Sequence, residues 1–250
     1  MTTETQLELS PPPAPRSVPA LHAWGWTVQG FYFFKANPVM WIVLIFIYLL
    51  IMVPVSLLPI VGSFLSALLA PVFAAGLMAA SKAVSRNEPL EINHLFLGFK
   101  QNTAQLVSVG GIYMLSLLII AIFVVLSLDK AVIELLIKGQ ELNVEQAQTV
   151  VMPILIAMLF FVPVVMAYWF APVLVGLHKV TAIEAMKLSF KASILNMLPF
   201  LLYGLIFMLL IVLAVIPFGI GLIVVVPMMM TSLYASYADI FKAVPPDNAA

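Results

Sequence analysis

The sequence predicts an all-α polytopic transmembrane helical bundle with six spans, arranged as three helical hairpins that each follow a cytoplasmic interfacial amphipathic helix. Two properties of the 250 residues point to this fold. First, 64% of them are hydrophobic and only 9% are charged, whereas soluble domains are about 45–50% apolar and about 25% charged. Second, the mean hydropathy is +1.15, and several uncharged stretches of about 20 residues are long enough to cross a ~30 Å hydrocarbon core. The composition therefore excludes an ordinary soluble globular protein.

Six apolar stretches meet this length requirement. No Asp, Glu, Lys or Arg lies within the core of the first five, and Asp239 lies near the end of the sixth, where it is expected to pair with Lys242 or to cap a helix end. Connections rich in proline and glycine at 59–62 and 217–221 predict tight antiparallel turns. The long polar connection at 129–149 is expected to contain a short surface helix. The predicted spans are 39–58, 63–82, 104–128, 150–177, 197–216 and 222–241.

Basic residues are divided unevenly between the two sides of this predicted bundle. Nine of the eleven Lys and Arg residues lie on the side of both chain ends, and the other two, Lys130 and Lys138, lie in the 129–149 connection. Because loops rich in Lys and Arg stay in the cytoplasm, both termini are expected to be cytoplasmic. Prolines near the start predict a disordered Pro-rich cytoplasmic tail over 1–20, with no cleaved signal peptide, and residues 243–250 form a C-terminal tail.

A Phe-Lys pair followed by an asparagine occurs three times, each time ahead of an apolar stretch. The spacing from Lys35 to Pro71 and from Lys191 to Pro227 is 36 residues in both cases, and the strings APVFAAGL and APVLVGL surround Pro71 and Pro172. We therefore predict a single transmembrane domain over 21–242 built from three copies of one unit. The three copies are expected at 21–83, 90–178 and 180–242, with lysines Lys35, Lys100 and Lys191 and asparagines Asn37, Asn102 and Asn196.

The segments ahead of the three lysines are expected to lie on the inner leaflet. Trp24 and Trp26 are candidate interfacial anchors, because tryptophan prefers the headgroup region. Lys35, Lys100 and Lys191 are interpreted either as orientation anchors or as contacts for anionic lipid headgroups. Membrane lipids are the expected partners, together with a membrane protein or a second copy of the chain, since small residues at four-residue spacing allow close helix contact. The formal net charge of zero gives no reason to expect a nucleic acid.

The sequence contains no recognisable catalytic, cofactor or metal site. There is no cysteine, and His22, His94 and His178 lack the spacing of paired metal ligands. No nucleotide-binding, metalloprotease or serine-hydrolase motif occurs. Pro71, Pro172 and Pro227 are expected to kink their spans, either as ordinary features of membrane helices or as the boundary of a cavity.

Two main functional hypotheses follow, and neither is an enzyme. The first is a non-enzymatic membrane protein that organises or assists partners or lipids. The second is a transporter or permease-like carrier for an uncharged or lipidic substrate, although coupled transporters usually carry ionisable groups at membrane depth. An intramembrane enzyme is a third hypothesis with no supporting motif.

Several short strings resemble known bacterial membrane families. The segment FAPVLVGLHKVTAIEAMKLSFKASILNMLPF at 170–200 is similar to the YciC-like inner-membrane families. Most of the chain resembles a group of six-span proteobacterial inner-membrane proteins, through an F-K-x-N-P string beginning at Phe34, an LF-x-GF-K string beginning at Leu95 and an ASY-x-DIF string beginning at Ala235. The resemblance implies a location in the bacterial inner membrane and implies no particular activity.

Overall fold

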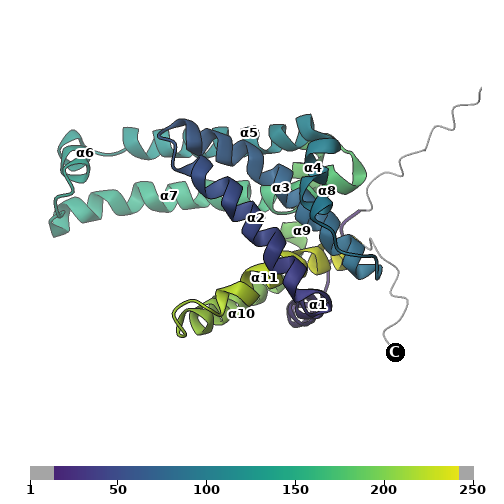
Figure 1. Cartoon of the computed structure of the whole chain (residues 1–250). Helices are drawn as coiled ribbons and strands as arrows, with labels where there is room; N and C mark the ends of the chain where they lie inside the picture. Colours follow the sequence, from purple (N-terminus) through teal and green to yellow (C-terminus); the bar gives the residue numbers. More distant parts are fainter. Residues whose placement is uncertain (1–13, 242–250) are drawn as a thin grey trace, which may run out of the picture.

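The computed structural model describes residues 14–241, and within that range the chain is helical and contains no β-strand (Figure 1). The elements are α1 (His22–Ala36), α2 (Pro38–Ser56), α3 (Val61–Ser85), the 3₁₀ helix η1 (Ile92–Phe96), α4 (Leu97–Lys100), α5 (Thr103–Leu126), α6 (Lys130–Ile137), α7 (Val144–Trp169), α8 (Ala171–His178), α9 (Ala182–Leu195), α10 (Met197–Val215) and α11 (Leu222–Ile240).

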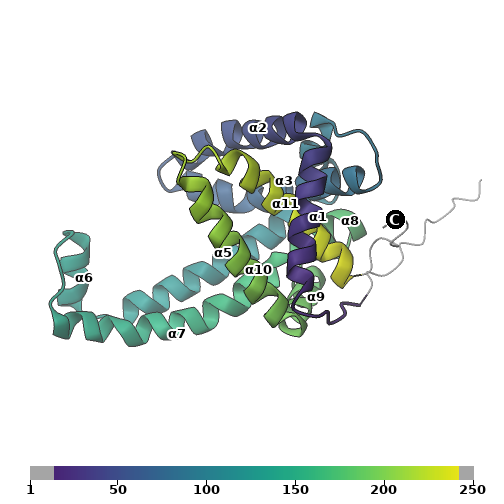
Figure 2. The ribbon, with the colours of Figure 1, turned by 90° about the horizontal axis from the view of Figure 1, so that it is seen from below.

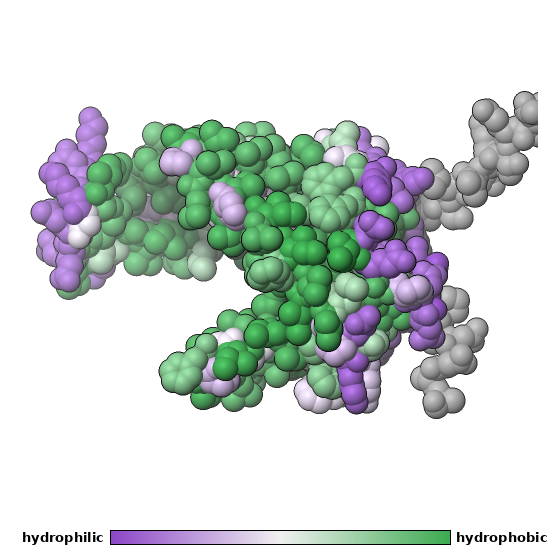
Figure 3. Space-filling view, viewed as in Figure 1, coloured by the Kyte–Doolittle hydropathy of each residue, from purple (hydrophilic) through white to green (hydrophobic). Residues whose placement is uncertain are grey.

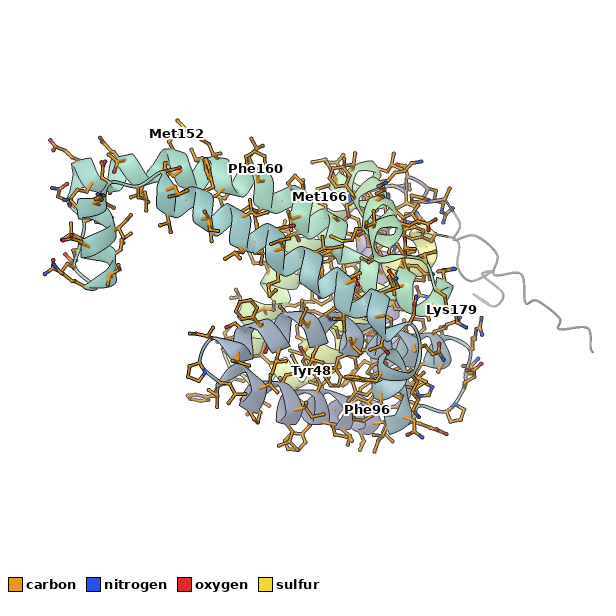
Figure 4. All side chains as sticks on the ribbon, turned by 90° about the horizontal axis from the view of Figure 1, so that it is seen from above. Tyr48, Phe96, Met152, Phe160, Met166 and Lys179 are labelled. Carbon is orange, nitrogen blue, oxygen red and sulfur yellow. The ribbon has the colours of Figure 1, made fainter. Side chains whose placement is uncertain are left out.

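The predicted all-α fold with six membrane-crossing helices is confirmed. Six helical segments in the described range are long and apolar enough to span a membrane: α2, α3, α5, α7 with α8, α10 and α11. Their lengths suit a bilayer, since the 19 residues of α2 extend about 28 Å and the 24 residues of α5 about 36 Å. Figure 3 shows an apolar belt between two polar ends of the molecule. On α7, Met152 and Phe160 in this belt are 62% and 56% exposed (Figure 4).

In the fourth span the helix is interrupted between α7 and α8 at Phe170, next to one of the three prolines expected to kink a span. Pro172 follows two residues later, and a proline ring disturbs the preceding turn of a helix. The hydroxyl of Ser189, on α9, fills the interruption: it accepts a hydrogen bond from the Phe170 N–H at 2.8 Å and donates one to the Met166 carbonyl at 2.7 Å. In contrast, α3 and α11 continue through Pro71 and Pro227.

The same order of elements occurs three times along the chain. A leading helix (α1, η1 with α4, or α9) precedes an outgoing helix (α2, α5 or α10), and a returning helix follows (α3, α7 with α8, or α11). Asn37, Asn102 and Asn196 each lie immediately before the outgoing helix of their unit. The Asn37 side chain accepts a hydrogen bond from the Met40 N–H, as expected of a residue that caps the start of a helix.

Each leading helix packs against the returning helix of the unit before it. Gly76 of α3 lies so close to the Leu95 carbonyl of η1 that a Cβ atom added at this glycine would be 2.2 Å from the oxygen. The leading helix α9 is joined to α7 by the hydrogen bond from the Ser189 hydroxyl to the Met166 carbonyl. The first leading helix, α1, packs against α11, the last returning helix (Figure 2). The units therefore form a closed ring in which the first contacts the third.

The contact between α1 and α11 depends on a glycine. A Cβ atom added at Gly30 would lie 2.5 Å from the Cβ atom of Ser232. The Gly30 carbonyl also accepts a hydrogen bond of 2.8 Å from the hydroxyl of Thr231. Both hydroxyl residues are fully buried. Small and hydroxyl residues at such crossings are typical of close helix packing in membranes.

Among the returning helices, α3, α8 and α11 are largely buried, and they contain the three prolines predicted to kink their spans, which are all buried. A Cβ atom added at Gly176 of α8 would lie 2.9 Å from the Cβ atom of Ala75 on α3, so these two helices cross closely. Aromatic contacts complete the packing around α3, where Phe73 lies against Tyr48 and Phe96 (Figure 4).

The N-terminal segment packs against the bundle from an earlier residue than the predicted start of the transmembrane domain at residue 21. The Arg16 N–H donates to the Ile240 carbonyl at 3.0 Å, and the Val18 N–H donates to the side chain of Asn196 at 2.9 Å. Val18 is 6% exposed. The predicted disordered tail over 1–20 is therefore wrong for residues 16–18, because hydrogen bonds hold them between α9 and α11. Residues 1–13, Lys242 and the predicted C-terminal tail lie outside the described residues.

Candidate functional site

The three repeated lysines lie at one end of the molecule, where α1, α4, α8 and α9 gather (Figure 1). We call this the basic end. Lys35 is in the last turn of α1, Lys100 is the last residue of α4, and Lys191 lies in α9. All three side chains are exposed. The structure therefore brings them to the same side of the belt, and their contact with lipid stays a prediction.

Of the two candidate tryptophan anchors, only Trp24 faces outward. Trp24 is 61% exposed, whereas Trp26 is 2% exposed. The Trp26 ring lies 5.6 Å from that of Phe200 and 6.2 Å from that of Tyr203, both on α10. The prediction that Trp26 contacts lipid is wrong, because α1 turns this residue toward the interior of the ring of helices.

Asp239 is the acceptor of a polar cluster that joins the two described ends of the chain. One carboxylate oxygen accepts from the Trp26 indole N–H at 2.8 Å and lies 2.7 Å from Nδ1 of His22. The other oxygen is paired with the guanidinium of Arg16, whose Nε–H also donates to the Asp239 carbonyl at 2.8 Å. The cluster fastens the N-terminal segment and α1 to the end of α11.

Sequence reasoning expected a partner for Asp239 nearby, at Lys242, and missed these three. They lie 213 to 223 positions away. A signal was present, since a lone carboxylate at the end of a span needs cationic or hydrogen-bonding partners. In the repeat, each returning helix packs against the leading helix of the next unit. The third returning helix, α11, has no following unit, so α1 is the leading helix that remains to supply these partners.

The three histidines have separate partners. His22 binds Asp239, His178 is hydrogen-bonded through Nε2 to the Tyr237 hydroxyl at 2.5 Å, and His94 contacts the backbone of Glu91. Each histidine therefore makes its own hydrogen bond, and the structure does not bring the three together.

The three prolines do not line either of the two cavities described below. At Pro71 the neighbouring helix is in contact, since a Cβ atom added at Gly110 of α5 would lie 3.1 Å from the Pro71 ring. Pro172 lies where α3 and α8 cross closely. The best candidate for a binding site is therefore between other helices.

A groove of about 570 Å³ separates α7 from α10. Its floor is formed by residues of α9 and α11, and its rim by exposed apolar side chains of α7 and α10. Met166, labelled in Figure 4, belongs to its α7 wall. The lining residues are Val162, Val165, Met166, Trp169, Ser193, Met197, Phe200, Leu201, Tyr203, Gly204, Phe207, Met208, Ile211, Val212 and Met229.

The few polar side chains of this groove are already engaged or covered. The Tyr203 hydroxyl is hydrogen-bonded to the Ser232 hydroxyl at 2.7 Å, and the Ser193 hydroxyl donates to the Met166 carbonyl at 3.2 Å. The indole nitrogen of Trp169 has no hydrogen-bond partner among the described residues, and it is covered by protein atoms. The groove therefore offers an apolar surface and no free hydrogen-bonding group.

A second cavity of about 650 Å³ lies between α5 and α9. Its lining is more polar and includes Gln105, Ser108 and Thr181. The Gln105 side chain accepts a hydrogen bond of 2.8 Å from the Ala182 N–H, so it serves to join α5 to the start of α9.

The apolar belt, the two polar ends and the six long apolar helices of the described chain define a polytopic α-helical membrane protein. Over 188 residues the chain is 31% identical to a protein of Burkholderia thailandensis named "Probable inner membrane protein", and the alignment covers 72% of this chain and 70% of that protein. The chain belongs to the family of this inner-membrane protein. No family model and no solved structure matches the chain. The more distant resemblance to the YciC-like families stays a prediction.

Proposed function

We propose that this protein is a non-enzymatic inner-membrane protein that gathers anionic lipids at its basic end. The observation that carries the proposal is the exposure of one lysine per unit, Lys35, Lys100 and Lys191, around the same end of the ring. Each basic residue near an anionic membrane surface contributes about 1 kcal/mol of attraction. Three such residues arranged around one ring attract several headgroups together.

The charge of the two ends supports this function. Within the described residues the basic end carries eight Lys or Arg residues and four carboxylates, a net charge of +4, while 129–145 carries two lysines and four carboxylates, a net charge of −2. Asp239 is paired with Arg16, which leaves the repeated lysines free of that carboxylate. The same asymmetry favours a cytoplasmic location for the basic end.

The test is the phospholipid that remains with the purified protein. Replacing Lys35, Lys100 and Lys191 together by glutamine is expected to lower the ratio of phosphatidylglycerol to phosphatidylethanolamine measured by mass spectrometry. The matched control replaces Lys130 and Lys138 of the opposite end by glutamine and is expected to leave the ratio unchanged. An unchanged ratio in the triple variant would show that the lysines only orient the helices.

A carrier for an uncharged or lipidic substrate is the second candidate, favoured by the apolar groove of about 570 Å³ between α7 and α10. A carrier must release what it binds to the opposite side of the membrane. Vesicles containing the protein and a fluorescent phospholipid are therefore assayed for transfer between leaflets. Transfer faster than in empty vesicles, and slowed by Pro172→Ala, would favour a carrier over an organising protein.

A further inference from the structure

The groove between α7 and α10 has the length and volume to hold a hydrocarbon chain. Along α10 its lining runs from Met197 to Val212, which is about 22 Å at 1.5 Å per residue. A cavity volume of about 570 Å³ extends over this length. A polymethylene chain, whose carbon atoms keep their neighbours about 4 Å away, fits a space of this length and volume.

A transmembrane helix of a partner does not fit the same space. An α-helix with its side chains is about 10–12 Å across, so a length of about 22 Å occupies about 1,700–2,500 Å³, several times the volume of the groove. Ordered water does not suit it either, because a buried water needs two to four polar partners. The polar atoms of the lining, on Ser193, Tyr203 and Trp169, are bonded within the protein or covered. The chemistry of the walls therefore selects hydrocarbon.

The position of the groove shows where such a chain comes from. Its α10 rim is formed by Leu201, Met208 and Val212, which are 67%, 54% and 57% exposed in the apolar belt. The groove thus opens sideways toward lipid. One end lies at Ser193 and Met197, on either side of the junction between α9 and α10. That junction, at Asn196, belongs to the basic end and is five residues from Lys191.

From this geometry we infer that the groove holds one acyl chain of a phospholipid from the leaflet at the basic end, with the glycerol and phosphate near the α9–α10 junction. This inference rests on the proposed lipid-gathering function and adds a defined binding site for one lipid chain. Lysines alone attract headgroups that exchange freely, whereas a chain in the groove holds one lipid molecule in place. The walls recognise the chain, and the basic end selects the headgroup.

A glycine in the groove makes the test specific. A Cβ atom added at Gly204 meets no atom within 4 Å, so the side chain introduced by Gly204→Leu starts in open space and is expected to occupy the groove. Gly25 of α1 is the matched control, because a Cβ atom there also meets nothing within 4 Å and Gly25 lies outside the groove. Both substitutions remove a glycine from a helix and add the same side chain.

The readout is native mass spectrometry of protein transferred from phosphatidylglycerol vesicles into detergent and washed until bulk lipid is gone. Wild type and Gly25→Leu are expected to keep one phospholipid, and Gly204→Leu is expected to keep about tenfold less, which corresponds to about 1.4 kcal/mol. Equal retention by Gly204→Leu and Gly25→Leu overturns the inference. Circular dichroism and gel filtration verify that both variants are folded.

A second measurement uses the wild-type groove and avoids any problem of folding. Phosphatidylglycerol brominated in the middle of its acyl chain is expected to quench the part of the tryptophan emission that Trp169→Phe removes, and the quenching is expected to persist after the washes. Recovery of the Trp169 emission on washing would contradict an acyl chain that stays bound in the groove. Loading the same protein from phosphatidylcholine vesicles separates the two proposals. If one lipid is retained whichever headgroup it carries, the result supports an acyl chain in the groove and contradicts selection of anionic headgroups by the basic end.

Discussion

Asp239 is expected to hold the ring of units closed, and Asp239→Ala is expected to release the N-terminal segment and α1 from α11. The carboxylate is the acceptor for Trp26, His22 and Arg16. Its removal leaves the indole N–H of Trp26, a residue that is 2% exposed, without an acceptor.

The expected loss of stability is dominated by Trp26. A buried hydrogen bond to a charged group contributes about 1.5–3 kcal/mol. The side chains of Arg16 and His22 are 44% and 42% exposed, so solvent reduces each of their pairs to about 0.5 kcal/mol. Asp239→Ala is therefore expected to weaken the docking of α1 by about 2–4 kcal/mol, a factor of about 30 to 1,000 in the docking equilibrium. Asp239→Asn keeps an oxygen for Trp26 and is expected to lose about half as much.

The assay uses the absence of cysteine from the chain. Val18 is 6% exposed in the docked segment, so Val18→Cys is protected from a maleimide reagent while the segment stays in place. Adding Asp239→Ala is expected to accelerate labelling by the factor above. Glu184→Ala, which removes an exposed carboxylate at the same end, is expected to change nothing.

The outcome that contradicts this reasoning is slow labelling of Val18→Cys in both backgrounds. A double-mutant cycle with Trp26→Phe adds a stricter condition, because residues in direct contact show coupling energies of about 0.5–3 kcal/mol. Additive effects of Asp239→Ala and Trp26→Phe would mean that the indole bond does not fasten α1.

Three further predictions concern the backbone. Ser189→Ala removes the hydrogen bond to the buried Phe170 N–H and the shorter of the two that the Met166 carbonyl accepts, and is expected to lower stability by about 1–3 kcal/mol, measured by thermal unfolding in detergent; an effect no larger than that of the exposed Ser108→Ala would contradict it. Gly30→Ala places a Cβ atom 2.5 Å from Ser232 and is expected to cost about 1–3 kcal/mol in the same assay, and unchanged stability would mean that α1 and α11 separate freely. Ile60 has a φ of 61°, which strains a β-branched residue by about 1–2 kcal/mol, so Ile60→Gly is expected to raise the unfolding temperature; a lower temperature would show that its side chain has a packing role.

The six spans could be predicted from the sequence because hydropathy is a local property of each stretch. The predicted 63–82 and the observed α3 (Val61–Ser85) differ by two or three residues at each end. The gathering of Lys35, Lys100 and Lys191 at one end was also predictable, since an even number of crossings separates any two of them.

The contacts between distant segments could not be predicted in the same way. The interruption at Phe170 depends on a hydroxyl supplied 19 residues later by Ser189. The burial of Trp26 depends on Asp239, 213 positions away, whereas a tryptophan near a span is usually interfacial. The groove combines residues of α7, α9, α10 and α11, and no single stretch of sequence reveals the space between them.

Contact between α1 and α11 has a consequence for biosynthesis. The ribosome makes α1 first and α11 last, and 204 residues separate Ala36 from Ile240. At about 5–20 residues per second, α1 waits about 10–40 s for its partner. In every nascent chain the first and third units therefore stay apart until translation is nearly finished, and a chain that ends before α11 cannot close the ring.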